Sequence, residues 1–298
     1  MLMFSQATLG LACALITVLS WAAAFPLIGV ALSGLDPLPL AAVRFTLAAC
    51  PAVIWLAIKR PEMPKLVDLA RLGLGGALGI SIYNWLLNTG QQTVSPGAAS
   101  FIINTLPIWT AMLATVFLRD RFGIGAWIAT AVSFSGVVLI AVGQPGPMRF
   151  GNGSSLILLA SMLSATYFVL VRGVIARYGP ATCTCWTLIT GALWLTPWLH
   201  DGMAQISVAS VSVISAVLFL GLVSASLGYA TWSIAIGHFG PASAANFLYL
   251  VPPIAVVLAW TLNGITPDIL TLIGGAVAIT GVVMLRISMA RSARKATA

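Results

Sequence analysis

The stretch SPGAASFIINTLPIWTAMLATVFLRDR at residues 95–121 returns in altered form as GPASAANFLYLVPPIAVVLAWTLNG at residues 240–264. A shift of 145 residues aligns 96–142 with 241–287 without a gap, and twelve of the forty-seven aligned positions are identical. So biased a composition gives roughly four or five identities by chance. The chain is therefore predicted to contain two related halves.

A proline lies inside both copies at equivalent positions, Pro107 in the first and Pro252 in the second. Proline has no N–H, and its ring disturbs the carbonyl group four residues earlier, here that of Ile103 or Leu248. A carbonyl group freed in this way inside a membrane must be satisfied by protein or by cavity water. We expect the two prolines to be a symmetry-related pair of hinges or kinks that shape a cavity.

The composition is that of a membrane protein, because 60% of the 298 residues are hydrophobic and only 7% are charged. Soluble domains carry about 25% charged residues. Apolar stretches long enough to span a bilayer predict an all-α protein of ten transmembrane helices, which leaves no segment for a separate soluble domain. The approximate spans are 7–31, 38–58, 67–89, 97–118, 123–142, 154–174, 181–199, 211–235, 242–263 and 268–288.

Five spans in each half predict inverted repeats, 1–145 and 146–298, because an odd number makes the second half enter the membrane from the opposite side. The loop at 59–71 is basic, whereas its counterpart at 200–210 has no lysine or arginine. Each half thus carries its basic residues on the loops that the other half leaves bare. Inverted repeats of this kind are the plan of many secondary transporters.

The basic residues also predict the orientation of the chain in the cytoplasmic membrane. With both termini in the cytoplasm, twelve lysines and arginines lie on the inner side, Arg149 lies outside, and Arg44 lies within a span. This is a strong positive-inside signal. The net charge of +8 is therefore assigned to topology and to contact with anionic lipid, and nucleic acid is not an expected partner. No lysine or arginine precedes Arg44, so we interpret the first apolar segment as a retained span.

The helix SWAAAFPLIGVAL at 20–32, the sequence AAVRFTLAA at 41–49 and the two proline-containing copies resemble the drug/metabolite transporter superfamily, EamA branch. The resemblance covers essentially the whole chain. It implies a ten-helix fold that exports small metabolites, often amino acids, and exporters of the YddG type are among its members. The glutamate usual after the fourth and ninth spans is missing here, since FLRDR offers Asp120 and TLNGIT offers no acid.

All six carboxylates lie in loops or at span ends, so no acid is expected at the bilayer midplane, where proton- or sodium-driven carriers often place one. This favours gradient-driven facilitated export or exchange and leaves proton coupling through other groups open. Arg44 is the one charge inside a span, ~9 Å from its outer end. It either attracts the carboxylate of an amino-acid substrate or ties helices together while reaching toward the interface.

Polar and aromatic side chains at mid-span are the candidate substrate-binding residues. Stacked rings with a few amides suit an aromatic or amphipathic solute. The alternative for each ring is packing or contact with lipid, and for each asparagine an interhelical hydrogen bond. The candidates are Trp21, Phe25, Arg44, Tyr83, Asn84, Asn88, Asn104, Tyr167, Tyr229, Trp232 and Tyr249.

These features predict a secondary transporter that moves a small molecule by alternating access, with spans 1, 3, 4, 6, 8 and 9 around the cavity and spans 5 and 10 as support. Nucleobases, sugars and drug-like amphiphiles are alternative solutes, and a channel or a membrane-embedded enzyme is a less favoured class. The only histidines, His200 and His238, lie near span ends, and the motifs of metalloproteases and serine hydrolases are missing. No metal or other cofactor is expected. The sequence leaves the oligomeric state open, and a monomer could suffice.

Overall fold

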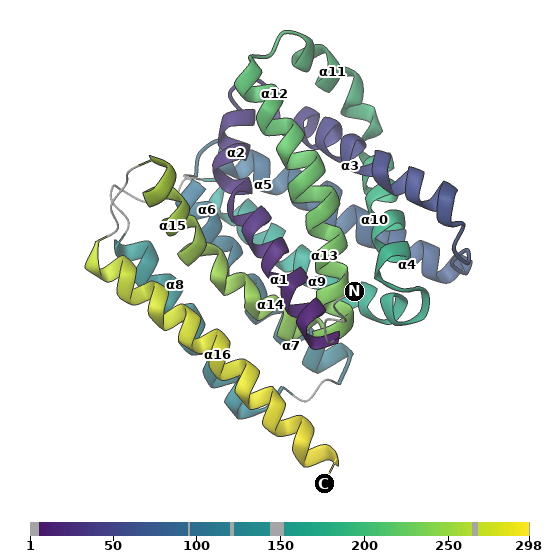
Figure 1. The fold of residues 1–298 in the computed structure, drawn as a ribbon. Helices are drawn as coiled ribbons and strands as arrows, with labels where there is room; N and C mark the ends of the chain where they lie inside the picture. The colour runs from purple at the N-terminus through teal and green to yellow at the C-terminus, as the bar shows by residue number, and fades with distance from the viewer. Residues whose placement is uncertain (1–5, 95, 120–121, 144–151, 264–267, 298) are drawn as a thin grey trace, which may run out of the picture.

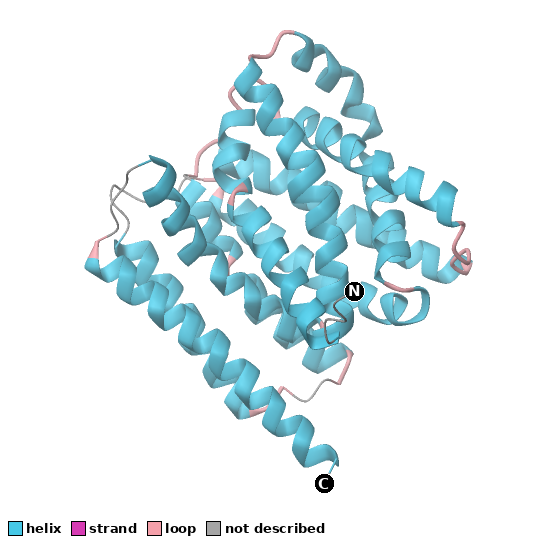
Figure 2. Cartoon of the chain, in the orientation of Figure 1, coloured by secondary structure: helices cyan, strands magenta, loops and turns pink. Residues whose placement is uncertain are grey.

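The computed structural model describes residues 6–94, 96–119, 122–143, 152–263 and 268–297. Within these ranges every regular element is a helix (Figure 2). Asp120 and Arg149, both predicted to lie in loops, are outside the described residues.

The helices follow one another with short connections (Figure 1). The first half contains α1 (Gln6–Ala22), α2 (Ala24–Ala31), α3 (Pro37–Lys59), α4 (Leu66–Gly76), η1 (Ala77–Ile82), α5 (Tyr83–Gln91), α6 (Pro96–Ile103), α7 (Leu106–Phe117) and α8 (Ile124–Gly143). The second half contains α9 (Ser154–Tyr178), α10 (Pro180–Leu195), η2 (Thr196–Trp198), α11 (Leu199–Ser207), α12 (Val211–Leu218), η3 (Phe219–Leu227), α13 (Gly228–Phe239), α14 (Pro241–Ala245), η4 (Asn246–Leu250), α15 (Val251–Asn263) and α16 (Ile269–Thr297).

Several of these helical stretches are long and apolar enough to cross a membrane, so the chain is a multi-pass membrane protein. Six stretches in the described part of the chain have at least 18 residues and high hydropathy, and three further apolar helices are shorter. The six are Thr8–Ala31, Pro37–Lys59, Leu66–Gln91, Pro96–Phe117, Ser154–Tyr178 and Val211–Phe239, and the shorter ones are Ile124–Ile140, Pro241–Val257 and Ile269–Leu285. The predicted span at 181–199 matches α10, which has 16 residues.

Both proline-containing spans change helical geometry immediately before the proline. In the first, α6 ends at Ile103 and α7 begins at Leu106, with Asn104 and Thr105 in a turn between them. In the second, the 3₁₀-helical η4 separates α14 from α15, which begins at Val251. The predicted interruption of both spans is therefore present. The carbonyl groups of Ile103 and Leu248 differ, however. The carbonyl oxygen of Leu248 accepts from the N–H of Val251 in a 3₁₀ hydrogen bond, so it is not left free.

Two other helices that correspond between the halves share an unusual feature. Between α4 and α5 lies the π-helical η1, and between α12 and α13 lies the π-helical η3. The 145-residue shift places η1 onto the second part of η3. Isolated π-helical turns are rare and are frequent at functional sites. Both segments face the interior of the bundle, where Gly79, Ile80, Leu220 and Ser224 are buried.

Small residues allow the closest approaches between helices. A Cβ on Gly75 or Gly79 would meet the ring of Tyr167 in α9. The pair α8 and α16 lies along one side of the bundle (Figure 1), and a Cβ on Gly136 would meet the backbone of Ala278. A Cβ on Gly281 would likewise meet Ser133. Small residues at helix contacts let backbones approach closely, so these glycines have a packing role.

Polar contacts between residues at or near helix ends join the two halves at both ends of the bundle. At one end, the buried carboxylate of Asp68 accepts from Arg177 Nη1 at 2.8 Å and from Arg71 Nη1 at 3.1 Å. At the other end, Gln205 Nε2 donates to Asp36 Oδ2 at 2.8 Å. The loops predicted to lie on the same side of the membrane are thus neighbours in space.

Candidate substrate cavity

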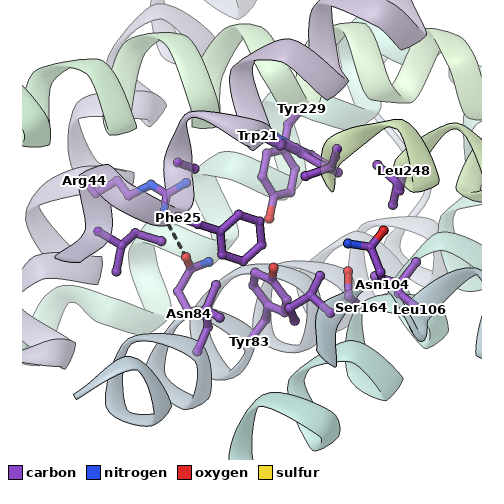
Figure 3. A pocket seen from close by; sticks show the side chains of 15 residues that line it. Trp21, Phe25, Arg44, Tyr83, Asn84, Asn104, Leu106, Ser164, Tyr229 and Leu248 are labelled. Carbon is purple, nitrogen blue, oxygen red and sulfur yellow. Dashed lines mark hydrogen bonds between the residues drawn. The ribbon is translucent and has the colours of Figure 1, made fainter. Parts of the chain in front are cut away.

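A cavity lies between the two halves and is lined by side chains of both (Figure 3). Its lining comes from α1, α2, α3, α5, α6 and α7 in the first half and from α9, α13, η4 and α15 in the second. None of its lining residues belongs to α8, α10 or α16. The lining residues are Trp21, Ala24, Phe25, Ile28, Arg44, Tyr83, Asn84, Leu87, Ile103, Asn104, Leu106, Ser164, Tyr229, Leu248 and Val251.

Arg44 is the charged residue of this cavity, and its side chain is held from both halves. It is only 5% exposed, its Nε donates to the carbonyl oxygen of Leu220 at 3.1 Å, and its Nη1 donates to Asn84 Oδ1 at 3.0 Å. Its guanidinium carbon lies 5.0 Å from the centre of the Phe45 ring. None of the ion pairs formed by the described residues involves Arg44. The arginine is therefore a buried cation with neutral hydrogen-bond acceptors and no carboxylate beside it.

The hydrogen bonds of Arg44 continue into the two π-helical segments. Leu220 lies in η3, and Asn84, which holds Nη1, donates its Nδ2 to the carbonyl oxygen of Ile80 in η1 at 2.8 Å. A guanidinium group carries five donors in a fixed planar fork. Two of its nitrogen atoms are thus committed to the protein, and the bonds fix the orientation of the planar group.

Aromatic side chains form much of the remaining wall. Tyr229 donates its hydroxyl to the carbonyl oxygen of Gly79 in η1 at 2.7 Å, and Trp21 donates Nε1 to the carbonyl oxygen of Ser224 in η3 at 2.9 Å. The two rings meet edge to face with 5.6 Å between their centres. Phe25 and Tyr83 lie beside them and point into the cavity (Figure 3). Because both polar ring atoms are bound to the backbone, the rings present fixed apolar surfaces to the cavity.

A second polar region lies at the break between α6 and α7. Asn104 is 2% exposed and donates its Nδ2 to the carbonyl oxygen of Ser100 at 2.6 Å, while its Oδ1 has no hydrogen-bond partner among the described atoms. Ser164 in α9 lines the same part of the cavity (Figure 3). A hydrogen bond of 3.1 Å between Thr105, in the turn between α6 and α7, and Ser161 joins this break to α9.

Seven of the eleven predicted binding residues line the cavity, and four do not. Asn88 donates its Nδ2 to the carbonyl oxygen of Pro37 at 3.0 Å, which is the interhelical hydrogen bond considered as its alternative. Tyr167 packs against Gly79, and Trp232 lies between the rings of Trp21 and Phe168. Tyr249 is fully buried, with its ring near Phe134 of α8 and its hydroxyl without a partner. These four side chains lie behind the lining or between helices.

Several apolar lining residues are not among the predicted binding residues, although the repeat contains a signal for some of them. The 145-residue shift relates Ile103 to Leu248 and Leu106 to Val251, and all four line the cavity. Lining residues that flank the two prolines could therefore have been found from the repeat. Ser164 has no such signal, because a lone serine in an apolar helix is common.

A comparison with protein-family models finds a match over most of the chain. The model of the EamA-like transporter family matches residues 8–142 and 151–287. The chain belongs to the EamA-like transporter family. Relatives of this EamA-like protein are named as transporters rather than enzymes. A crystal structure that covers 96% of the chain, and is itself covered to 99%, has the same fold with a TM-score of 0.73 at 16% identity.

Three of its relatives span almost the same length. A probable terminal-alkyne amino-acid exporter of Streptantibioticus cattleyicolor is 33% identical over 91% of both chains. The uncharacterized transporter YdfC of Bacillus subtilis is 32% identical over 88% of this chain and 86% of its own. The uncharacterized inner membrane transporter YedA of Escherichia coli K12 is 24% identical over 83% of this chain and 80% of its own. General membrane transport is therefore the function of this family member.

Proposed function

We propose that the protein exports amino acids with aromatic or other amphipathic side chains across the cytoplasmic membrane. The observation that carries the proposal is Arg44, a 5% exposed cation in a central cavity without a carboxylate partner among the described residues. Insertion of an arginine near the bilayer centre costs about 2.5–3.5 kcal/mol on translocon scales. A substrate carboxylate bound to Arg44 would supply the missing opposite charge.

The geometry of Arg44 supports a carboxylate as this anion. Its Nε and Nη1 are held by Leu220 and Asn84, and no described residue accepts from its Nη2. A carboxylate that approaches from the cavity can therefore accept from the guanidinium group while the side chain stays in place. Hydrogen bonds between such ions are about twice as strong as those between neutral groups.

The aromatic walls of the cavity support the proposed class of substrate side chain. Trp21, Phe25, Tyr83 and Tyr229 surround the space next to Arg44 (Figure 3). Because the polar ring atoms of Trp21 and Tyr229 are already bound to the backbone, these walls favour an apolar or aromatic group over a strongly polar one. The relative named as a probable terminal-alkyne amino-acid exporter agrees with a solute of this class.

The transport cycle that we propose uses the two inverted five-helix repeats, 1–145 and 146–298, as the halves that rock against each other. All ten predicted segments would cross the membrane, the shorter helices included, and both termini would lie in the cytoplasm. Because none of the five carboxylates in the described residues lines the cavity, we propose facilitated export or exchange as the mode of transport. The binding partners are then the solute and the lipid bilayer, and a monomer is sufficient.

The rival within the same class is a carrier of drug-like amphiphiles, which the mostly apolar lining favours. A counterflow screen of the full-length protein in proteoliposomes separates the two, using amino acids, nucleobases, sugars and a cationic amphiphile as trans solutes. Saturable counterflow of amino acids supports the proposal. Counterflow of the amphiphile alone would contradict it, and a non-saturating flux would indicate a channel.

A further inference from the structure

Two polar side chains at the α6–α7 break line the cavity with groups that have no partner. Asn104 is 2% exposed, and its Nδ2 donates to the carbonyl oxygen of Ser100, which fixes Oδ1 as the other end of the amide. This Oδ1 is buried without a hydrogen-bond partner among the described atoms. Ser164 of α9 is 6% exposed, and its hydroxyl group has no partner among the described residues. A buried polar atom left unpaired costs free energy, so a ligand group that bonds to this pair is favoured.

The Asn104–Ser164 pair and Arg44 lie on opposite sides of the cavity. The rings of Phe25 and Tyr83 lie between them (Figure 3). The carboxylate and ammonium groups of an α-amino acid are attached to one carbon atom, so both stay on the Arg44 side when the carboxylate binds there. A group that meets the pair must therefore belong to the far end of the substrate side chain, beyond an apolar part that lies along the two rings.

The chemistry of the pair favours a hydroxyl group as this end group. Asn104 Oδ1 only accepts hydrogen bonds, whereas Ser164 Oγ can donate or accept. A hydroxyl group can donate to the first and accept from the second. The apolar side chains of Leu106 and Leu248 line the same part of the cavity (Figure 3). Hydrogen bonds are stronger in such surroundings than in water, and unpaired polar groups are more costly.

We propose that Asn104 and Ser164 form a subsite for a hydroxyl group at the far end of an aromatic substrate side chain. With the carboxylate at Arg44, the ring lies along Phe25 and Tyr83, and its para hydroxyl group donates to Asn104 Oδ1 and accepts from Ser164 Oγ. The cavity then prefers para-hydroxylated aromatic amino acids, such as tyrosine, over phenylalanine. This inference rests on the proposed function and names a specificity-determining site within it.

The corresponding break in the second half does not offer the same groups. The position equivalent to Asn104 is Tyr249, which does not line the cavity, and the carbonyl oxygen of Leu248 accepts from the N–H of Val251. The repeat is therefore symmetric in its interruptions and asymmetric in its chemistry. This asymmetry gives the substrate one orientation, with its carboxylate toward α3 and the end of its side chain toward the α6–α7 break.

The test compares matched ligands on the purified full-length protein by isothermal titration calorimetry. L-Tyrosine, L-phenylalanine and 4-methyl-L-phenylalanine share the backbone groups and the ring and differ only at the para position. A site that bonds a substrate hydroxyl group disfavours analogues without it, because its own polar groups are then left unpaired. Two neutral hydrogen bonds correspond to a preference of about tenfold for L-tyrosine over each of the other two. L-ortho-Tyrosine, whose hydroxyl group is on the wrong ring carbon, should bind no better than L-phenylalanine.

Asn104→Leu and Ser164→Ala should each reduce the preference for L-tyrosine over L-phenylalanine, because each removes one of the two hydrogen bonds. Asn88→Leu is the matched control for Asn104→Leu, because Asn88 also has a buried amide oxygen without a partner but does not line the cavity. It should leave the preference intact. Ser164→Ala serves if Asn104→Leu does not fold, and the wild-type comparison needs no variant.

Equal binding of L-tyrosine and L-phenylalanine by the wild type would overturn the hydroxyl subsite and leave a carrier of aromatic amino acids. Binding of 4-methyl-L-phenylalanine or L-ortho-tyrosine as tight as that of L-tyrosine, or an unchanged preference in a folded Asn104→Leu or Ser164→Ala variant, would do the same. Binding of L-leucine alone would overturn the subsite and leave a carrier of other amphipathic amino acids. If neither these aromatic amino acids nor L-leucine bind, the proposed function itself is wrong, and the subsite with it.

Discussion

Tyr229 and Gly79 join the two halves of the protein through a 2.7 Å hydrogen bond, in which the phenol of Tyr229 donates to the Gly79 carbonyl oxygen inside the π-helical η1. Arg44 makes the reciprocal contact, because its Nε donates to Leu220 in the π-helical η3. Each half therefore sends a cavity side chain onto the π-helical segment of the other. The cavity and the contact between the halves are built from the same residues.

Tyr229→Phe should destabilise the protein, since it removes this donor and keeps the ring. Interhelical hydrogen bonds in membranes average about 0.6 kcal/mol and reach about 1.7 kcal/mol, so the apparent melting temperature should fall by a few degrees. Tyr249→Phe is the matched control, because the buried hydroxyl of Tyr249 has no partner. Thermal unfolding of both variants in detergent checks the prediction, and equal stability of the two would contradict the assigned role of the Tyr229 hydroxyl.

Asp68→Asn should loosen the contact between the halves at the end of the bundle where α4 meets α9. The Asp68 carboxylate is 2% exposed and accepts from Arg177, Arg71 and Tyr178, while the two arginines are half exposed. Loss of its charge should cost about 1–3 kcal/mol, because the arginines can still be solvated. Asp201→Asn changes an exposed carboxylate and should have no effect. Thermal unfolding of the pair measures the difference.

Gly136→Ala should be poorly tolerated, because its Cβ would meet the backbone of Ala278 and Gly274, which cannot move aside as a side chain can. We expect a loss of about 1–3 kcal/mol from overpacking between α8 and α16. Gly173→Ala, where nothing lies within 4 Å of the added atom, should instead be neutral or stabilising by up to about 1 kcal/mol. Thermal unfolding of both variants measures the difference in stability. A Gly136→Ala protein as stable as the wild type would show that α8 and α16 pack less closely than the structure indicates.

Single cysteines test the orientation that the basic loops predict. In a Cys50→Ala background, an impermeant maleimide should label Ser207→Cys in intact cells and leave Glu62→Cys unlabelled. Position 62 lies between α3 and α4, and position 207 is the last residue of α11; both are exposed, and the basic residues assign them to opposite sides of the membrane. Permeabilised cells, in which both should react, are the control. Labelling of Glu62→Cys alone in intact cells would place the termini outside.

The sequence predicted the positions of the helices well because apolar length and loop charge are strong local signals in a membrane. The chemistry of proline predicts interruptions at Pro107 and Pro252, and helix boundaries lie directly before both residues, while their role as hinges stays a prediction. The π-helical turns could not be foreseen, because no residue type in ALGISI or FLGLVSASL requires them. Likewise, Tyr167 and Trp232 have the composition of lining residues, and only the packing shows that Gly79 and Phe168 cover them.

Repeat symmetry was a better guide to the cavity than residue type alone. Asn84 and Tyr229 are related by the 145-residue shift, and both line the cavity and bond to η1. Asn104 and Tyr249 are related in the same way, yet only Asn104 lines it. The two breaks also differ in backbone geometry, because the second is 3₁₀-helical and keeps the Leu248 carbonyl group bonded.

The central claim is that Arg44 binds the carboxylate of an amino acid, and counterflow in proteoliposomes tests it most directly. Wild-type protein and Arg44→Ala are compared for L-phenylalanine and for 2-phenylethylamine, which lacks the carboxylate. Saturable counterflow of phenylalanine by the wild type should fall at least about tenfold in Arg44→Ala, in line with the loss of a charge-assisted hydrogen bond, while any flux of the amine does not fall. Unchanged phenylalanine counterflow in a folded Arg44→Ala protein would contradict the account.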